Sequence, residues 1–326
     1  MAMRTLLMTG ASRGLGRTAA EHLLRANPDL HLLVTSRGTS GNRLAAELAE
    51  ATGNPHVSAV CCNLAARECI RAAADEIAGR LAAGDLPPLC GFVGNAGLQL
   101  TTRTRTDADG VELTFSVNVL ANWLLIRLLW EHFTAPSRIV VVGSDTHFGD
   151  LRHNMGMVPA PRWESVQALA APHHDKRAHT ASEGRTAYST SKLAVLYLVH
   201  ALARRLPEGI DAYTFNPGYV PGTGLVRDAG PAVQLLSRTV LHALTATPLA
   251  LSPARAGRLL AEVAAGPRPG PTGAYIDRHS VDRSSAESYD EDREEELWRT
   301  AAELCGVSGG PDVPRAEGRA RGRGAP

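Results

Sequence analysis

The fold is decided near the start of the chain, by the stretch Thr9-Gly10-Ala11-Ser12-Arg13-Gly14-Leu15-Gly16. An apolar run from Thr5 to Met8 predicts a strand before it, and the pattern from Leu15 to Arg25 predicts a helix after it. The glycines let the backbone turn sharply and approach a pyrophosphate, and the helix start offers that group free N–H donors and a positive dipole end. A glycine cluster alone is a weak signal, but between a first strand and a first helix it favours a dinucleotide site.

Strands and helices alternate along the rest of the chain. The segments expected as strands are 30–36, 56–61, 89–93, 138–142 and 210–215, and those expected as helices are 42–51, 65–83, 111–133 and 187–206. This alternation predicts the α/β class, with a Rossmann-type doubly wound parallel sheet and helices on both faces. We predict a single catalytic domain over 1–305, an insertion at 145–185 where the alternation stops, and a disordered Gly-, Pro- and Arg-rich tail at 306–326.

The end of the second expected strand bears on the choice of dinucleotide. Arg37 stands 37 − 16 = 21 residues beyond the last glycine of the loop. Folds that bind NAD place an acidic residue near this point for the ribose 2′-hydroxyl, whereas arginine accommodates a 2′-phosphate. No acid occupies positions 35–37, and Arg13 offers a second positive charge. The sequence therefore favours NADP(H), with ordinary surface arginines in an Arg-rich chain as the alternative.

A tyrosine and a lysine form the second motif. Tyr188 and Lys192 are four residues apart in an expected helix that the tyrosine opens, so both side chains lie on one face. A free tyrosine has a pKa of about 10 and is a poor base at neutral pH. A nearby ammonium and the oxidised nicotinamide ring would lower that pKa by stabilising the phenolate. The chain holds only two lysines, Lys176 and Lys192, so the spacing favours a proton-transfer pair over two helix-surface residues.

The order of these motifs resembles the short-chain dehydrogenase/reductase family, over roughly residues 3–280. Asn95-Ala96-Gly97 is similar to the family's NAG motif, although Gly94 replaces its usual first asparagine. Asn118 and Ser144 match the family's catalytic asparagine and serine, and Pro217-Gly218, followed by Thr223, matches its segment at the nicotinamide end. Asn63 stands where an aspartate often contacts adenine, and an amide can make a similar hydrogen bond.

The resemblance implies a role for each of these residues. Tyr188 is the expected acid/base, and Lys192 is expected to hold the nicotinamide ribose and lower the pKa of Tyr188. Ser144 is expected to hydrogen-bond the substrate oxygen, and Asn118 to position a water in the proton path. The expected cofactor contacts are Thr9, Gly10, Ser12, Arg13, Gly14, Leu15, Gly16, Arg37, Asn63, Leu64, Asn95, Ala96, Gly97, Tyr188, Lys192, Pro217, Gly218, Val220 and Thr223.

The spacing of 188 − 144 = 44 residues between serine and tyrosine resembles the retinol dehydrogenase and protochlorophyllide reductase branch. Light-driven protochlorophyllide reduction is not expected, because the branch's active-site cysteine has no counterpart in 145–185. In the family a helical lid covers the substrate at the position of 221–253, and its apolar residues suggest an apolar substrate. Packing against the core or a second subunit is the alternative for this segment.

We therefore expect hydride transfer between NADP(H) and a carbonyl/alcohol pair, as in a ketoreductase of secondary metabolism. A non-catalytic NADP(H)-binding redox sensor and a C=C reductase are the alternatives. The intact set of catalytic residues argues against the sensor, because a sensor has no need of a proton path. The family also suggests a homodimer or homotetramer.

Composition narrows the remaining classes. A formal net charge of +1 gives no reason to expect nucleic acid or a membrane surface as partner, and no signal-peptide pattern is seen, so a cytoplasmic location is expected. The five cysteines lack CxxC spacing and are expected as buried free thiols. No metal site is expected. Five histidines in or near the insertion are expected to be exposed on loops, namely His147, His153, His173, His174 and His179.

Overall fold

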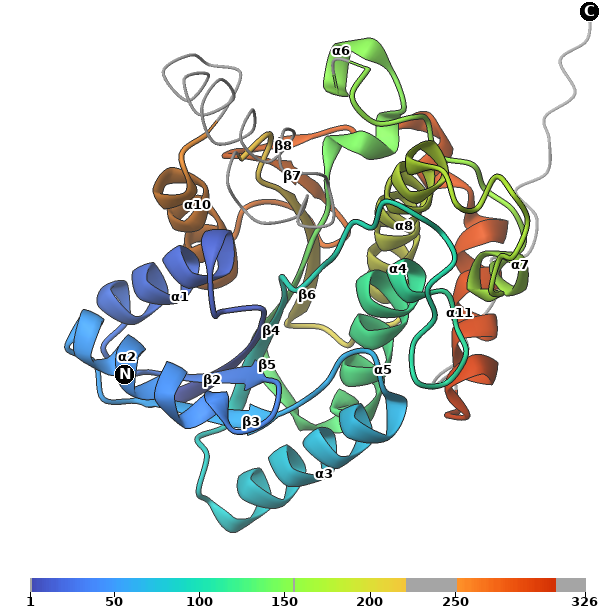
Figure 1. Cartoon of the computed structure of the whole chain (residues 1–326). Helices are drawn as coiled ribbons and strands as arrows, with labels where there is room; N and C mark the ends of the chain where they lie inside the picture. Colours follow the sequence, from blue (N-terminus) through green and yellow to red (C-terminus); the bar gives the residue numbers. More distant parts are fainter. Residues whose placement is uncertain (1, 155, 221–250, 309–326) are drawn as a thin grey trace, which may run out of the picture.

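One sheet organises the chain in the computed structural model, which describes residues 2–154, 156–220 and 251–308 (Figure 1). Its order is β3-β2-β1-β4-β5-β6-β7-β8. The strands are β1 (Arg4–Thr9), β2 (Leu30–Ser36), β3 (Val57–Cys61), β4 (Leu89–Gly94), β5 (Phe133–Val142), β6 (Ile210–Asn216), β7 (Tyr275–Asp277) and β8 (Ser280–Asp282). All neighbouring pairs are parallel except β7 with β8, which are antiparallel. The strand order reverses between β1 and β4, and ligands of open α/β sheets bind at such a point.

Helices cover both faces of this sheet (Figure 1). The longer ones are α1 (Gly14–Ala26), α2 (Ser40–Thr52), α3 (Arg67–Ala83), α5 (Ala121–Leu128), α8 (Ala181–Ala203), α10 (Pro253–Ala265) and α11 (Glu291–Cys305). Side chains of α1, α2 and α10 share one buried apolar cluster with the sheet, and those of α3, α5, α8 and α11 share another. The predicted doubly wound α/β fold is confirmed.

The helix expected over 111–133 is present but shorter than expected, and it is interrupted by a π-helical turn. The structure has a short α4 (Leu113–Phe115), a π-helical turn (Ser116–Leu120), α5 and a 3₁₀ turn (Trp130–His132), and β5 already begins at Phe133. The Asn122 side chain donates to the Asn118 carbonyl at 2.8 Å, so a side chain enters the helical hydrogen-bond ladder where it widens. Turns of this kind interrupt α-helices frequently at functional sites.

The helix that carries Tyr188 begins earlier than expected. Thr180 caps α8, because its hydroxyl accepts the N–H of Glu183 at 3.3 Å, and the helix starts at Ala181 instead of Ala187. The tyrosine therefore lies about two turns inside α8 and does not open it. Thr180 and Glu183 form a T-x-x-E pattern, a known sequence sign of a helix start.

The C-terminal part adds elements for which no strand or helix had been predicted. In α11, the Trp298 ring packs edge-on against Trp123 and Trp130, with centroids 5.6 and 6.2 Å away. The helix ends at Gly306 in the left-handed region, and the N–H of Val307 bonds the Ala302 carbonyl at 3.1 Å. Ordered chain thus continues past the predicted boundary at 305, and the predicted tail from 309 onward lies outside the described residues.

The predicted insertion contains a 3₁₀ turn (Asp145–Phe148) and two short helices, α6 (Leu151–Asn154) and α7 (Val166–Ala170). Val166 and Leu169 are buried in the same cluster as residues of α11, and the Val166 N–H donates to Glu296 at 2.9 Å. This half of the insertion therefore packs against α11. Of the expected lid, 221–250 lies outside the described residues, and Pro253 is the first residue of α10, a helix that packs with α1.

Candidate active site

The predicted site residues gather where the parallel strands end. Gly10 follows β1, Asn95 follows β4, Ser144 follows β5 and Pro217 follows β6. These strands lie side by side in the sheet, so their carboxyl ends open onto one edge. The residues come from distant parts of the sequence, and the topology brings their loops together.

The glycine loop is built to leave its backbone accessible. Gly10 has a φ of +71°, and a side chain on Gly16 would overlap the Gly10 carbonyl oxygen. The Asn95 amide donates to the carbonyls of Thr9 and Gly10, at 3.2 and 3.0 Å, and the Ala96 N–H donates to the Thr9 hydroxyl at 3.0 Å. The predicted cofactor contact Asn95 thus holds the loop in shape through its side chain.

The start of α1 fits a pyrophosphate. Arg13 occupies the cap position with extended backbone, and its side chain makes no capping hydrogen bond to the helix. The first N–H groups of a helix need an acceptor, and an anion meets that need. Ser12 and Arg13 are exposed at this end while Leu15 is buried in the core, which fixes the loop against the sheet. The cradle between Gly10 and Gly16 therefore suits the phosphates of a dinucleotide.

The expected adenosine contacts lie on the neighbouring strands. Arg37 directly follows β2 and is exposed. The Asn63 side chain accepts the N–H of Ala65 at 3.3 Å, which fixes the turn after β3, and Leu64 packs against the core beside it. Both positions lie on the same half of the sheet as the glycine loop.

Tyr188 and Lys192 lie together on the buried side of α8. The Lys192 Nζ is 5.6 Å from the Tyr188 ring centroid and donates to the Val142 carbonyl at 2.8 Å. The Ser144 side chain lies beside the Tyr188 phenol, close enough to act on its pKa. Tyr188 and Lys192 are each only 6% exposed, so substrate would meet them out of contact with bulk water.

The fourth predicted catalytic residue, Asn118, lies in the π-helical turn and is 1% exposed. Its amide donates to the Ser191 hydroxyl at 2.9 Å and to the Leu98 carbonyl at 3.0 Å, and its side-chain oxygen accepts the Leu98 N–H at 2.9 Å. A side chain on Gly97 would lie 3.3 Å from the Asn118 oxygen and 3.8 Å from the Lys192 ammonium. Gly97 therefore leaves open the space between these two groups.

Burial shifts the titration of three groups here. It raises the pKa of the Tyr188 phenol above its ordinary range, and the Ser144 side chain opposes this shift. Burial lowers the pKa of Lys192 to about 8, and it raises the pKa of Asp145, next to Ser144, to about 6. At neutral pH the phenol is therefore protonated, the state from which it can donate to a carbonyl oxygen.

The nicotinamide-end segment follows β6. Gly218 has a φ of +68°, and its N–H donates to the Asn216 side chain at 3.1 Å. The Arg278 side chain lies against Gly218, and Arg278 has a φ of +56°, a region that non-glycine residues rarely occupy. Val220 is buried. Thr223 lies outside the described residues.

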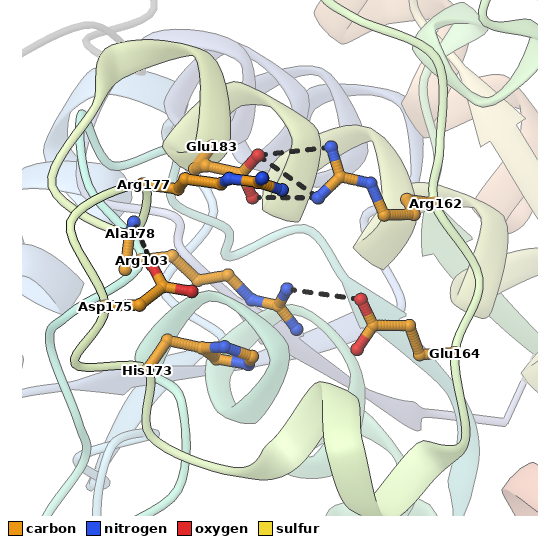
Figure 2. Close-up of a pocket in the computed structure, with 8 residues that line it drawn as sticks. All are labelled: Arg103, Arg162, Glu164, His173, Asp175, Arg177, Ala178 and Glu183. Carbon is orange, nitrogen blue, oxygen red and sulfur yellow. Dashed lines mark hydrogen bonds and ion pairs between the residues drawn. The ribbon is translucent and has the colours of Figure 1, made fainter.

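The insertion forms a cavity elsewhere (Figure 2). It measures about 220 Å³ and is lined by Arg103, Arg162, Glu164, His173, Asp175, Arg177, Ala178 and Glu183. Figure 2 shows Arg162 paired with Glu183 and Arg103 facing Glu164. The nearest nitrogen and oxygen of Arg103 and Glu164 are 3.9 Å apart. The lining of the cavity includes none of the four predicted catalytic residues, and its three arginines are matched by three acidic residues. We therefore interpret this cavity as the polar contact between the insertion and the loop after β4. It is separate from the candidate active site.

Two expectations about reactive side chains need correction. His147 is buried beside Ser144, because its ring bonds backbone groups on both sides, so it is not an exposed loop residue. Cys61 and Cys69 are exposed instead of buried, since they lie at the end of β3 and in the first turn of α3 with their side chains toward solvent.

Among the described residues, no three His, Cys, Asp or Glu side chains are placed to hold a metal ion. No helix in the described ranges has the length and apolar character to cross a bilayer.

Known proteins with similar sequences define the family. A family model described as short chain dehydrogenase matches residues 4–154. The chloroplastic protochlorophyllide reductase of Chlamydomonas reinhardtii is 30% identical over 329 residues, spanning 94% of this chain and 78% of that protein. The chain belongs to the short-chain dehydrogenase family.

Other comparisons agree with that assignment. Human retinol dehydrogenase 13 is 28% identical over 318 residues, covering 93% of this chain and 85% of that protein. The structure of an NADPH-bound carbonyl reductase from chicken fatty liver superposes with a TM-score of 0.58 and 19% identity, over 86% of this chain and 99% of that one, which shows a shared fold. The predicted resemblance to the retinol dehydrogenase and protochlorophyllide reductase branch is confirmed. As a short-chain dehydrogenase, the protein is an oxidoreductase with a nicotinamide dinucleotide, NAD(H) or NADP(H), as its cofactor.

Proposed function

We propose that this short-chain dehydrogenase reduces the carbonyl group of an apolar substrate to an alcohol with NADPH. The observation that carries the proposal is the meeting of Tyr188, Ser144 and Lys192 in one buried space beside the carboxyl end of β5. A bound nicotinamide cofactor would supply the hydride. The steps assigned to this chain are to orient the carbonyl, exclude water and deliver one proton.

Tyr188 is suited to give that proton. Its phenol is protonated at neutral pH because burial raises its pKa. As hydride reaches the carbonyl carbon, negative charge develops on the oxygen, and the Ser144 hydroxyl can stabilise it while the Tyr188 proton is transferred. The Lys192 ammonium, 5.6 Å from the ring centroid, then stabilises the phenolate left behind. The reverse reaction, alcohol oxidation, would begin from the Tyr188 phenolate. Burial disfavours the phenolate because it raises the pKa of Tyr188.

Asn118 connects the site to the interior of the π-helical turn. It holds Leu98 and Ser191 by side-chain hydrogen bonds, so the loop after β4 and helix α8 keep a fixed distance. The open space at Gly97 lies between Asn118 and Lys192. We propose that a water held there returns the proton to Tyr188 between turnovers.

The preference for NADPH rests on Arg37. It stands at the exposed end of β2, where an acidic residue would instead favour NADH. The apolar character of the substrate rests on the related retinol dehydrogenase 13, whose name refers to an apolar alcohol, and on the leucines and valines of 221–250. The ketoreductase role, homo-oligomeric assembly and cytoplasmic location belong to the same proposal.

The test is NADPH oxidation with apolar ketones and aldehydes, retinal among them, in wild-type protein, Tyr188→Phe and Tyr289→Phe. Tyr289 is exposed and serves as the matched control. We expect Tyr188→Phe to lose about 10²–10⁴-fold in kcat, the usual worth of a general acid, while Tyr289→Phe stays normal. Turnover of an enone only at its C=C bond would favour the C=C reductase. If all three proteins bind NADPH tightly but none of them turns over any substrate, the redox sensor is favoured.

A further inference from the structure

His147 lies one 3₁₀ turn beyond Ser144 and is 1% exposed. Its Nδ1 is 2.6 Å from the Ser144 carbonyl oxygen, and its Nε2 is 3.2 Å from the Ser285 backbone nitrogen. The ring also packs on Phe148 and Tyr275, with centroids 4.1 and 5.1 Å away. One side chain thus spans the gap between the end of β5 and the C-terminal part of the chain.

These two partners fix the protonation of the ring. The Ser285 backbone N–H can only donate, so Nε2 must be the unprotonated acceptor. The single ring proton then resides on Nδ1, where it is donated to the Ser144 carbonyl. Burial lowers the pKa of His147 to about 4. The nearby His153 and His200 lower this pKa further, whereas the negative charge of Asp150 raises it. The bridging neutral form therefore persists across neutral pH.

The far end of the bridge leads back to the catalytic helix. Ser285 precedes a 3₁₀ turn (Ala286–Tyr289), and this turn is fixed to α8 by two hydrogen bonds. The Tyr197 hydroxyl donates to the Glu287 carbonyl at 2.9 Å, and His200 Nδ1 bonds the Ser288 carbonyl at 2.9 Å. A continuous series of hydrogen bonds therefore connects Ser144, through His147 and the turn that follows Ser285, to α8, the helix that carries Tyr188.

We propose that His147 is a positioning residue that holds the Ser144 backbone, so that the serine hydroxyl meets both Tyr188 and the substrate oxygen. The Ser144 hydroxyl has competing partners, because it accepts the Thr146 N–H at 3.3 Å and lies 3.4 Å from an Asp145 oxygen. Both bonds are long, so the hydroxyl can exchange them for a substrate oxygen as long as the backbone holds it within reach of that oxygen. This inference rests on the proposed carbonyl reduction, in which Ser144 contacts the reacting oxygen.

Three substitutions separate the two bonds of the imidazole. The amide nitrogen of His147→Asn can take the place of Nδ1 and keep the bond to Ser144, and the amide oxygen of His147→Gln can take the place of Nε2 and keep the bond to Ser285. His147→Phe keeps the ring packing and neither bond. His179→Phe, at an exposed position of the insertion, is the matched control.

We expect kcat to fall by roughly ten-fold or more in His147→Phe and His147→Gln, because small displacements at a reacting centre are costly. In His147→Asn most of that loss should be recovered, with NADPH affinity within a few-fold of wild type in every variant. Wild-type kcat in His147→Phe overturns the proposal. So does a His147→Asn variant as impaired as His147→Phe while His147→Gln is normal, since the Ser285 bond alone would then matter.

A second measurement does not need a substrate. In ¹⁵N-labelled protein, the imidazole signals lost in His147→Phe should show the Nδ1-protonated form, unchanged between pH 5 and 8. An Nε2-protonated ring, or one that titrates in this range, overturns the proposal even if carbonyl reduction is established. Conversely, a correct tautomer with no turnover of any carbonyl substrate leaves the bridge in place and refutes the proposed function.

Discussion

The Lys192 ammonium lies 5.6 Å from the centroid of the Tyr188 ring and bonds the last carbonyl of β5, that of Val142, at 2.8 Å. The charge proposed to stabilise the phenolate is thus attached to the strand that presents Ser144. A displacement of α8 relative to β5 would change the proton donor and the oxygen-binding group together. The chemistry of the site therefore depends on the packing of one helix against one strand end.

Lys192→Arg should be severely damaging, although arginine is the chain's usual basic residue. A guanidinium is broader than an ammonium and spreads its charge, and the lysine here is buried beside Gly97. We expect kcat/KM to fall about 10²-fold or more. The control is Lys176→Arg, at the chain's only other lysine, which is exposed.

The same lysine predicts a pH dependence. Because its pKa is lowered to about 8, Lys192 loses its charge as pH rises through that value, and kcat/KM of the wild type should decline above it. Lys176→Arg should show the same decline. A wild-type profile that stays flat to pH 10 would remove the lysine charge from the rate-determining chemistry.

Gly16→Ala should weaken dinucleotide binding, because the new methyl group would overlap the Gly10 carbonyl and the Asn95 amide. Overpacking of this kind costs about 1–3 kcal/mol, or roughly 5–150-fold in affinity if the loop absorbs it. Titration of NADPH by its fluorescence measures the effect. Gly79→Ala is the control, since it lies in α3 with open space around it and should leave affinity unchanged while slightly raising stability.

Arg37→Asp should reverse the cofactor preference. The change removes a charged partner of the 2′-phosphate and adds repulsion, so KM for NADPH should rise about ten-fold or more while KM for NADH holds or falls. Arg258→Asp, an exposed arginine on α10, controls for the change in net charge. A wild type that already prefers NADH would show that Arg37 is an ordinary surface residue.

Asp145→Asn should stabilise the protein in a pH-dependent way. Burial raises the pKa of this carboxyl to about 6, with Asp277 adding to the shift and Arg278 opposing it, so the folded state resists its ionisation. The destabilisation is absent below about pH 4, where both states are protonated, and grows as pH rises to about 6. The asparagine variant should gain on the order of 2 kcal/mol at pH 7 and almost nothing at pH 4. Thermal unfolding at both pH values tests this, with the exposed Asp75→Asn as control.

The sequence predicted best the strands that are buried apolar runs between turn residues, whereas the partly exposed first half of β5, from Phe133 to Ser137, was missed. The second strand, 30–36, matches β2 at both ends, since Pro28-Asp29 precedes it and Arg37-Gly38 follows it. Strands β7 and β8 have three residues each, too few to show a period of two, so no pattern marked them. The π-helical turn around Asn118 could not be predicted for another reason. It coincides with a hydrogen bond from the Asn122 side chain to the Asn118 carbonyl, and the spacing of apolar residues gives no sign of such a bond.

For the site, the sequence named the residues proposed to carry the chemistry, and it did not name the residues that hold them in place. Tyr188 and Lys192 share a motif, so their spacing was legible. The buried His147 ring bonds Ser285, 138 positions away, and the pKa of Asp145 is raised by burial and by Asp277 in β7. Such relationships exist only once the chain is folded.

The unequal burial of the two lysines has a practical consequence. Lys192 is enclosed by the site, whereas Lys176 is exposed on the insertion, between Asp175 and Arg177 in the sequence. Of the two lysine side chains, only the amine of Lys176 is therefore accessible to an amine-reactive linker. Coupling through it would attach each molecule to a solid support by the insertion, with the glycine loop on a different segment. If the N-terminal amine, which has the lower ordinary pKa, is blocked first, coupling through Lys176 would give an immobilised biocatalyst of one orientation without an engineered tag.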